Sequence, residues 1–407
     1  MRISTSTIFN SGVYGMQQLQ AGINHTQQQL SSGNRIITPA DDPVAAAQAL
    51  EVGQANSINT QYQANQNAAN TRMTLNENAL QSVTTLIQGV QSLVVSAGNS
   101  SITNTDRTAI ASQLSGDLQQ LVGLANSTDG TGVYLFAGGM GNAAPFQNTA
   151  SGVQYVGDQS TQHMQISPSE QIQVSLSGAD VFQNIRTGNG SFVVQGATSN
   201  SGSATVNSSQ VTNQTDWNAS SKNFSIKFNV SGGGTSYDVI DNSTGTTVLS
   251  AQPYTAGNAI SLGPTSGASV TISGSPGNGD TFNITASQNQ SVFTTIGNLI
   301  TALNTSVTGP GSQAALTNSL SNATQNLANA LSNVLTVRAA NGSRLNEVTT
   351  AQSDSSSLGL QYQSRLATLT SVDYTAAISK LNQQTLALTA AQKSFVQVSN
   401  LSLFNYM

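Results

Sequence analysis

The sequence predicts a mainly α-helical protein with an inserted β domain. Apolar residues recur with a seven-residue period over residues 1–125 and again over residues 293–407. Between these arms the period changes to strict alternation, and turn-forming stretches such as SGGGTS and SPGNGD interrupt it. We therefore expect the N- and C-terminal arms to form an antiparallel, coiled-coil-like helical rod. The β-rich central domain is expected at its distal end, with both termini together at the other end.

The N-terminal arm contains three expected helices. The first ends near Ser32, and its apolar seam consists of Phe9, Met16, Leu19, Ile23, Thr26 and Leu30. The second runs from Pro43 to about Ala97, roughly 80 Å at 1.5 Å per residue, and Met73, Leu80, Ile87 and Val94 keep its period. The stretch GNSSITNT ends it, and a third helix follows over residues 105–125.

The middle segment, residues 133–288, is expected to form the β-rich domain. Phe224, Ile226, Phe228 and Val230 alternate with polar residues, which is typical of a half-buried strand. The Ser-, Asn- and Gly-rich stretch over residues 196–221 is predicted to be a mobile loop.

The helical period then returns over the C-terminal arm. A short helix over residues 293–303 is followed by a coiled-coil seam of Leu320, Leu327, Val334, Asn341 and Val348. Asn341 and Arg344 on this seam reduce stability while fixing the register of the helices. A last helix follows Tyr374, and its apolar side comprises Ile378, Leu381, Leu388, Ala391, Phe395, Val398 and Leu401.

The composition excludes several classes of function. Charged residues make up only 7% of the chain, against a norm of roughly 25%, and the net charge is −5. Twelve basic residues give no phosphate-neutralising patch, so we expect neither nucleic acid nor anionic membrane as a partner. No apolar run approaches the length of a membrane span, and the N-terminus lacks the apolar core of a cleaved Sec-type signal peptide.

The sequence offers no pattern of catalytic or ligand-binding residues. Cysteine is absent, and His25 and His163 are the only histidines and lie far apart. This leaves neither metal-ligand spacing nor a convincing Ser/His/Asp set, and His25 is expected to be a solvated helix residue. We therefore expect no enzyme activity, no cofactor and no metal.

The connection between the first two helices, SSGNRIITPADDPVAA, concentrates charge and proline in an otherwise uncharged region. Asp42 before Pro43 predicts a helix start, and Asp41 is expected to interact favourably with the helix dipole. Pro39 forces Thr38 into extended geometry. We hypothesise that Arg35 pairs with Asp41 or Asp42, within or between subunits, and thereby holds this linker in one shape.

The terminal helices have too little apolar surface to be well ordered on their own. We expect them to be mobile in the free monomer and to fold when packed against the same helices of adjacent subunits. The heptad pattern alone would also allow an ordinary intramolecular bundle, and that alternative stays open.

Three stretches, LSSGNRIITPADDPVAAAQAL, ANSTDGTGVYLFAG and SVDYTAAISKLNQQTLALTAAQKSFVQVSNLSLFNYM, resemble the bacterial flagellin superfamily. The opening MRIST and the run TPADDPVAA favour its flagellin-like, hook-associated junction members over flagellins proper. The resemblance implies inner, tube-forming helices over residues 1–32 and 372–407. It also implies a helical rod over residues 33–132 and 289–371, and an outer domain over residues 133–288.

The resemblance also implies a function. It predicts a secreted structural component of the bacterial flagellum, exported by the flagellar type III pathway, that forms the junction zone between hook and filament and templates filament attachment. The implied partners are further copies of the chain, the neighbouring hook-associated protein, flagellin and a cytoplasmic chaperone on the C-terminal helix. Alternatives are a filament-forming flagellin, or a secreted adhesin or enzyme whose β domain binds a surface glycan.

Overall fold

The computed structural model describes residues 5–150 and 152–400. In chain order its helices are α1 (Thr5–Ser32), α2 (Pro43–Ala97), α3 (Asn104–Ala125), α4 (Gly178–Phe182), α5 (Gln214–Ala219), α6 (Val292–Asn304), α7 (Pro310–Thr370) and α8 (Tyr374–Asn400). The bounds predicted for α2 agree with the structure. α7 is longer than its predicted seam, because the weakly apolar stretch after Ala351 continues the helix.

The chain forms two compact units. Unit 1 combines the described residues up to Gln66 with those from Thr350 onward, and unit 2 comprises Asn67–Thr349. The helices α2 and α7 contribute residues to both units. The three-part domain boundaries expected from the sequence stay a prediction.

The strands of unit 2 pair in an antiparallel manner. A five-stranded sheet has the order β10 (Thr246–Pro253), β9 (Gly234–Asp241), β8 (Asn223–Ser231), β13 (Thr281–Ala286), β6 (Phe192–Gly196). A three-stranded sheet has the order β11 (Ala259–Ser261), β12 (Ala268–Ser273), β7 (Thr205–Val211). There are also three two-stranded sheets in unit 2. They pair β1 (Phe146–Thr149) with β2 (Gly152–Tyr155), β3 (His163–Ser167) with β4 (Glu170–Gln173), and β5 (Ile185–Arg186) with β14 (Asn289–Gln290).

In β8, Phe224, Ile226 and Phe228 are buried as predicted, but Ser225 is buried as well and Val230 is 38% exposed, so the strict alternation predicted over residues 224–230 holds only in part. The prediction of a mobile loop over residues 196–221 is wrong, because this stretch forms β7 and α5. Trp217 of α5 is buried and its ring centroid lies 4.9 Å from that of Phe192, so one large side chain fixes a stretch of weakly apolar composition.

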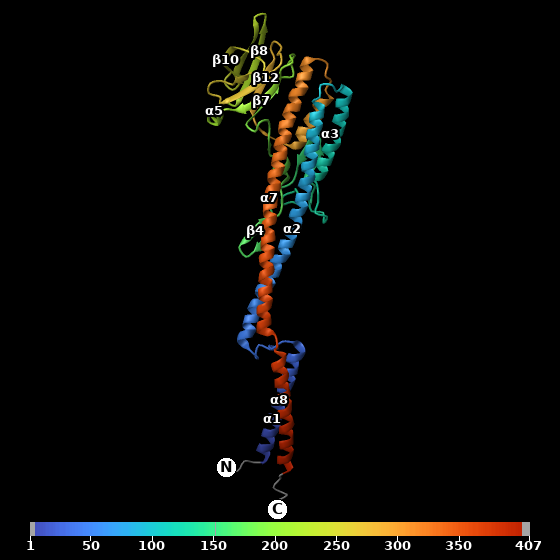
Figure 1. Cartoon of the computed structure of the whole chain (residues 1–407), viewed down its shortest axis with the longest axis vertical. Coiled ribbons are helices and arrows are strands. Elements are labelled where there is room, and N and C mark those ends of the chain that lie inside the picture. The colour runs from blue at the N-terminus through green and yellow to red at the C-terminus, as the bar shows by residue number, and fades with distance from the viewer. Residues whose placement is uncertain (1–4, 151, 401–407) are drawn as a thin grey trace, which may run out of the picture. The chain divides into compact units, whose positions relative to one another are not determined.

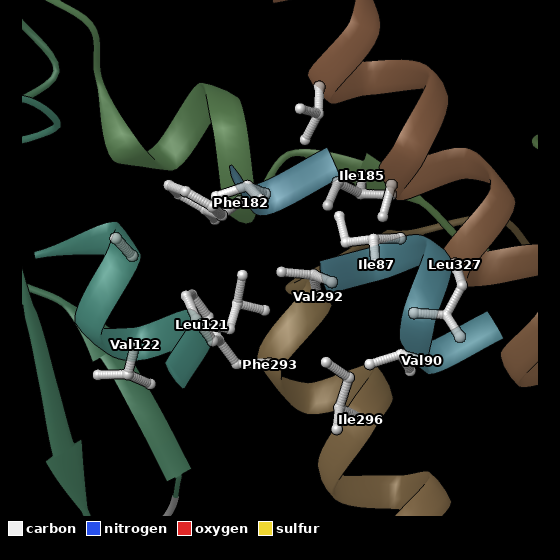
Figure 2. Packing of buried hydrophobic residues seen from close by; sticks show 14 of the residues in the cluster. Ile87, Val90, Leu121, Val122, Phe182, Ile185, Val292, Phe293, Ile296 and Leu327 are labelled. Carbon is white, nitrogen blue, oxygen red and sulfur yellow. The ribbon is translucent and has the colours of Figure 1, made fainter. Parts of the chain in front are cut away.

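The main core of unit 2 lies between α2, α3, α6 and α7. Figure 2 shows Ile87 and Val90 of α2, Phe293 of α6 and Leu327 of α7 converging on one cluster. Phe293 is 2% exposed, and its ring centroid lies 5.1 Å from that of Phe146. This cluster is the apolar seam that the heptad pattern predicts for α2 and α7.

Asparagines along one face of α7 attach the helix to the neighbouring chain segments of unit 2. They lie three or four residues apart, and their side chains hydrogen-bond to backbone atoms between residues 180 and 206; they are Asn318, Asn322, Asn326, Asn329 and Asn333. Further along α7, Asn341 Nδ2 donates to Met73 O over 2.9 Å, and Arg344 Nη2 donates to Gln173 Oε1 over 2.8 Å. Part of the high asparagine content of the chain is therefore explained by these hydrogen bonds from α7 to neighbouring segments.

Candidate functional site

The linker between α1 and α2 lies in unit 1 beside the connection between α7 and α8. Arg35 N donates to Thr370 O over 2.7 Å, and Val372 N donates to Gly33 O over 2.9 Å. Gly33 has a φ of +71°, a conformation that favours glycine, and this residue turns the chain out of α1. The two connections therefore hold each other through backbone hydrogen bonds.

Asp42 and Pro43 begin α2 in the way that the sequence predicts for a helix start. Asp42 Oδ1 accepts a hydrogen bond from Ala45 N over 3.0 Å, and Pro43 is the first helical residue, where no N–H is needed. The Ala45 N–H, followed by the Arg35 guanidinium, lowers the pKa of Asp42 below its ordinary value. The carboxylate is thus held in its charged form.

Arg35 connects the start of α2 with the end of α7. Its Nη1 lies 3.0 Å from Asp42 Oδ2, and its Nη2 donates to Leu369 O over 3.0 Å. The Arg35 side chain is 44% exposed and that of Asp42 32% exposed, so water screens the pair. The pair with Asp42 forms within one chain; a role between subunits stays a prediction.

Asp41 hydrogen-bonds within the linker itself, and its predicted interaction with the helix dipole stays a prediction. Its Oδ2 accepts from Ile37 N and Thr38 N over 2.9 and 2.8 Å, which closes the turn around the exposed Pro39. The Thr38 and Ile37 N–H groups lower the pKa of Asp41. His25 Nε2 lies 3.0 Å from Asp41 Oδ1, so His25 connects α1 to this turn and is more than a solvated helix residue.

The helices α1 and α8 lie side by side and antiparallel (Figure 1). Ile23 and Thr26 of α1 are buried, and Thr26 Oγ1 donates to Gln384 Oε1 over 3.0 Å. The rings of Phe9 and Phe395 lie 4.9 Å apart. A Cβ at Gly12 would come within 2.8 Å of the Phe395 ring, so this glycine permits the close approach of the two helices.

The residues predicted for the terminal assembly helices fall into two groups. In the first group Ile23 is buried and the others are half-buried; they are Met16, Leu19, Leu30, Leu381, Leu388 and Phe395. In the second group, Ile378 and Val398 are 49% and 51% exposed. Leu401 lies outside the described residues. The Thr26–Gln384 bond could not be predicted, because polar residues on a seam interrupt the apolar period.

A groove of about 540 Å³ runs along the α1–α8 pair, with Val13, Met16 and Leu388 among its lining residues. Within residues 5–150 and 152–400, no helix has the length and apolar character needed to cross a membrane. The same part of the chain contains no group of three or more His, Cys, Asp or Glu residues placed to hold a metal ion. The packed helices α1 and α8 and the groove along them form the candidate packing surface of unit 1.

Comparison with known proteins agrees with this geometry. Residues 3–140 match the bacterial flagellin N-terminal helical region. The chain is 28% identical over 405 residues to flagellar hook-associated protein 3 of Salmonella typhimurium, with 99% of each protein covered. The corresponding protein of Escherichia coli is 27% identical over 405 residues, again with 99% of each covered.

Solved structures give the same result. FlgL of Xanthomonas campestris is 33% identical with a TM-score of 0.72, and the match covers 78% of this chain and 99% of that one. The flagellar junction protein FlgL of Legionella pneumophila is 27% identical with a TM-score of 0.71, covering 80% and 100%. Fold and matches together define a flagellin-like protein of the bacterial flagellum. More narrowly, the chain belongs to the family of flagellar hook-associated protein 3, also named FlgL.

Proposed function

We propose that this protein is a structural subunit of the flagellar junction zone and that copies assemble between hook and filament through unit 1. The observation that carries the proposal is the incomplete burial of the α1–α8 pair. Large apolar side chains stay exposed on these helices; they are Ile8, Phe9, Tyr14, Ile378, Leu386, Val396 and Val398. Each fully buried side chain of this size contributes about 1.5–3 kcal/mol, so neighbouring copies gain by covering them.

Assembly would also complete the folding of these helices. In an isolated pair of helices with half-buried seams, the free energy gained by apolar burial is small compared with the cost of the lost conformational entropy. The groove lined by Val13, Met16 and Leu388 offers a place for a further helix. We therefore propose a transition from mobile to ordered terminal helices as each copy docks on a template.

The partners follow from this role. We propose the neighbouring hook-associated protein on the hook side, flagellin on the filament side, and a cytoplasmic chaperone that covers α8 before export. Export through the flagellar type III pathway would place the protein in the extracellular flagellum. The contribution of the chain is structural, so none of its residues is assigned a catalytic role.

Electron microscopy of cells that lack the protein tests the proposal. We expect hooks without filaments, with flagellin shed into the medium, and restoration by the full-length chain. Normal filaments in the deletion strain would overturn the junction role. If the purified protein polymerised unaided into long tubes, the filament-forming alternative would replace it. Restoration of motility by a chain lacking residues 133–288 would argue against an adhesin whose β domain binds glycans.

A further inference from the structure

The contact between α2 and α7 within unit 1 is made of amides and small residues. We name this contact the amide seam and define it as Asn59, Gln63 and Gln66 of α2 with Ala351, Ser355 and Gly359 of α7. Ser355 O accepts from Asn59 Nδ2 over 2.7 Å and from Gln63 Nε2 over 3.0 Å. Gln66 Nε2 donates to Ser355 Oγ over 2.8 Å and to Ala351 O over 3.3 Å.

The amide seam buries polar and small side chains, and large aliphatic side chains next to it in sequence are exposed. Asn59 is 6% exposed and Gln66 is fully buried, whereas Ile58, Leu358 and Leu360 are 46%, 41% and 66% exposed. Gly359 has no side chain to pack, and a Cβ there would lie 3.3 Å from Asn59 Nδ2. Burial of apolar surface, the main stabilising contribution between packed helices, is therefore small at this contact.

Both helices are also intrinsically weak where they meet. Residues 53–60 of α2 read GQANSINT, and residues 353–359 of α7 read SDSSSLG. Gly, Ser, Asn, Thr and Asp are poor helix formers, because they gain backbone freedom or competing hydrogen bonds outside the helix. Low propensity and low apolar burial thus coincide on facing segments of two long helices.

We infer that the amide seam is a built-in flexure, at which α2 and α7 separate and bend locally before their other contacts are lost. The amides can exchange their backbone acceptors for water at little net cost, since water replaces both partners of each bond. Segments with few buried apolar contacts open most readily in native proteins. Such a bend would let one subunit contact neighbouring subunits that are spaced at different distances. This consequence rests on the proposed junction function, whereas the flexure itself does not.

Hydrogen–deuterium exchange of the full-length chain, followed by mass spectrometry, tests the inference. Peptides covering residues 53–62 and 353–362 should exchange about tenfold faster than those covering residues 80–94 and 320–334. They should also exchange faster than residues 43–52, where fraying from the start of α2 would be greatest. Equal or slower exchange at the amide seam would show that the amides clamp the helices in register, and would overturn the inference.

Two double variants test the inference in a second way. Asn59→Leu combined with Gln66→Met keeps side-chain volume and replaces two buried amides by apolar groups. We expect exchange in both segments to slow about tenfold. The matched control, Gln54→Met with Asn78→Leu, changes exposed positions of α2 and should leave exchange within about twofold of the parent chain. No slowing in a seam variant with native circular dichroism would contradict the flexure. Because the readout does not involve filaments, its failure is distinguishable from failure of the junction role.

Discussion

The helices α2 and α7 take part in both units, but different chemistry holds them in each. In unit 2 they bury Leu80, Val83 and Ile87 against Leu327 and Val334 as part of the main core. In unit 1 the same two helices meet through the amide seam. One long helix can therefore be rigid over some turns and compliant over others, because local side chains determine local stability.

The α1–α8 pair extends this contrast. Its seam is mostly half-buried, and several large apolar side chains stay exposed beside it. Unit 2, by comparison, encloses two clusters of buried apolar residues. Unit 2 thus buries its apolar clusters within one chain, whereas unit 1 leaves the apolar surface exposed that neighbouring copies cover in the proposed assembly.

The largest expected effect comes from truncating the unit 2 core. Phe293→Ala removes a fully packed ring beside Phe146 and Phe182, and should lower the free energy of unfolding by about 3–5 kcal/mol in urea titrations. Phe9→Ala in unit 1 is the matched control; this ring is 51% exposed, so the loss should stay below about 1 kcal/mol. Equal losses from the two variants would remove the contrast between the units.

A smaller effect is expected at the buried hydrogen bond of the α1–α8 pair. Thr26→Val keeps the shape of the side chain and deletes the donor to Gln384, which should cost about 0.5–1.5 kcal/mol. Amide exchange along α8 near Gln384, compared in the assembled proteins, measures this loss. Thr389→Val, at an exposed position of the same helix, serves as the control and should change little. Unchanged exchange in Thr26→Val would mean that the bond contributes nothing to the pairing.

The linker arginine should have a weaker effect, because its ion pair is screened by water. Arg35→Ala removes the contacts with Asp42 and Leu369, and we expect roughly two- to fivefold faster amide exchange over residues 36–46. Arg365→Ala, at an exposed position of α7, is the control. Assembly and motility that are unaffected by Arg35→Ala would count against the hypothesis that Arg35 holds this linker in one shape.

Acid should loosen the same linker. The folded pKa values of Asp41 and Asp42 lie below the ordinary 3.8, so their contribution is fully present above that pH and is lost as pH falls through the lowered values. The amide chemical shifts of Ile37 and Thr38, followed by NMR from about pH 5 to about pH 2, should report the change. Asp41→Asn should remove most of this pH dependence, and shifts that do not move would contradict the turn's reliance on the carboxylate.

The sequence predicts those features of this fold that arise from a regular apolar period. The extent of α2 and the burial of Phe224, Ile226 and Phe228 in β8 follow from a period of seven or two. The Asp42–Pro43 helix start also follows, because capping depends on adjacent residues.

Features that depend on side chains distant in sequence meeting across the fold could not be predicted. Trp217 orders a stretch that reads as a loop, and His25 meets Asp41 across sixteen positions of sequence. The amide seam interrupts the apolar pattern. The pattern therefore predicts only a weak helix there and does not indicate which groups the amides bind. Such contacts require the three-dimensional arrangement, since an amide can bond to any backbone carbonyl within reach.

The smallest effect on the free chain, and the most direct test of the contrast, is expected at an exposed apolar residue of α8. Ile378 is 49% exposed, so Ile378→Ser should change the free energy of unfolding of the monomer by no more than about 0.5 kcal/mol. Assembly should nevertheless weaken, because a neighbouring copy would then cover a hydroxyl in place of an apolar side chain. Leu388→Ser, in the groove of the pair, should instead weaken both the pairing of α1 with α8 and the assembly. Sedimentation of the purified variants separates the two outcomes, and an Ile378→Ser protein that assembles like the parent would show that this face of α8 stays in water.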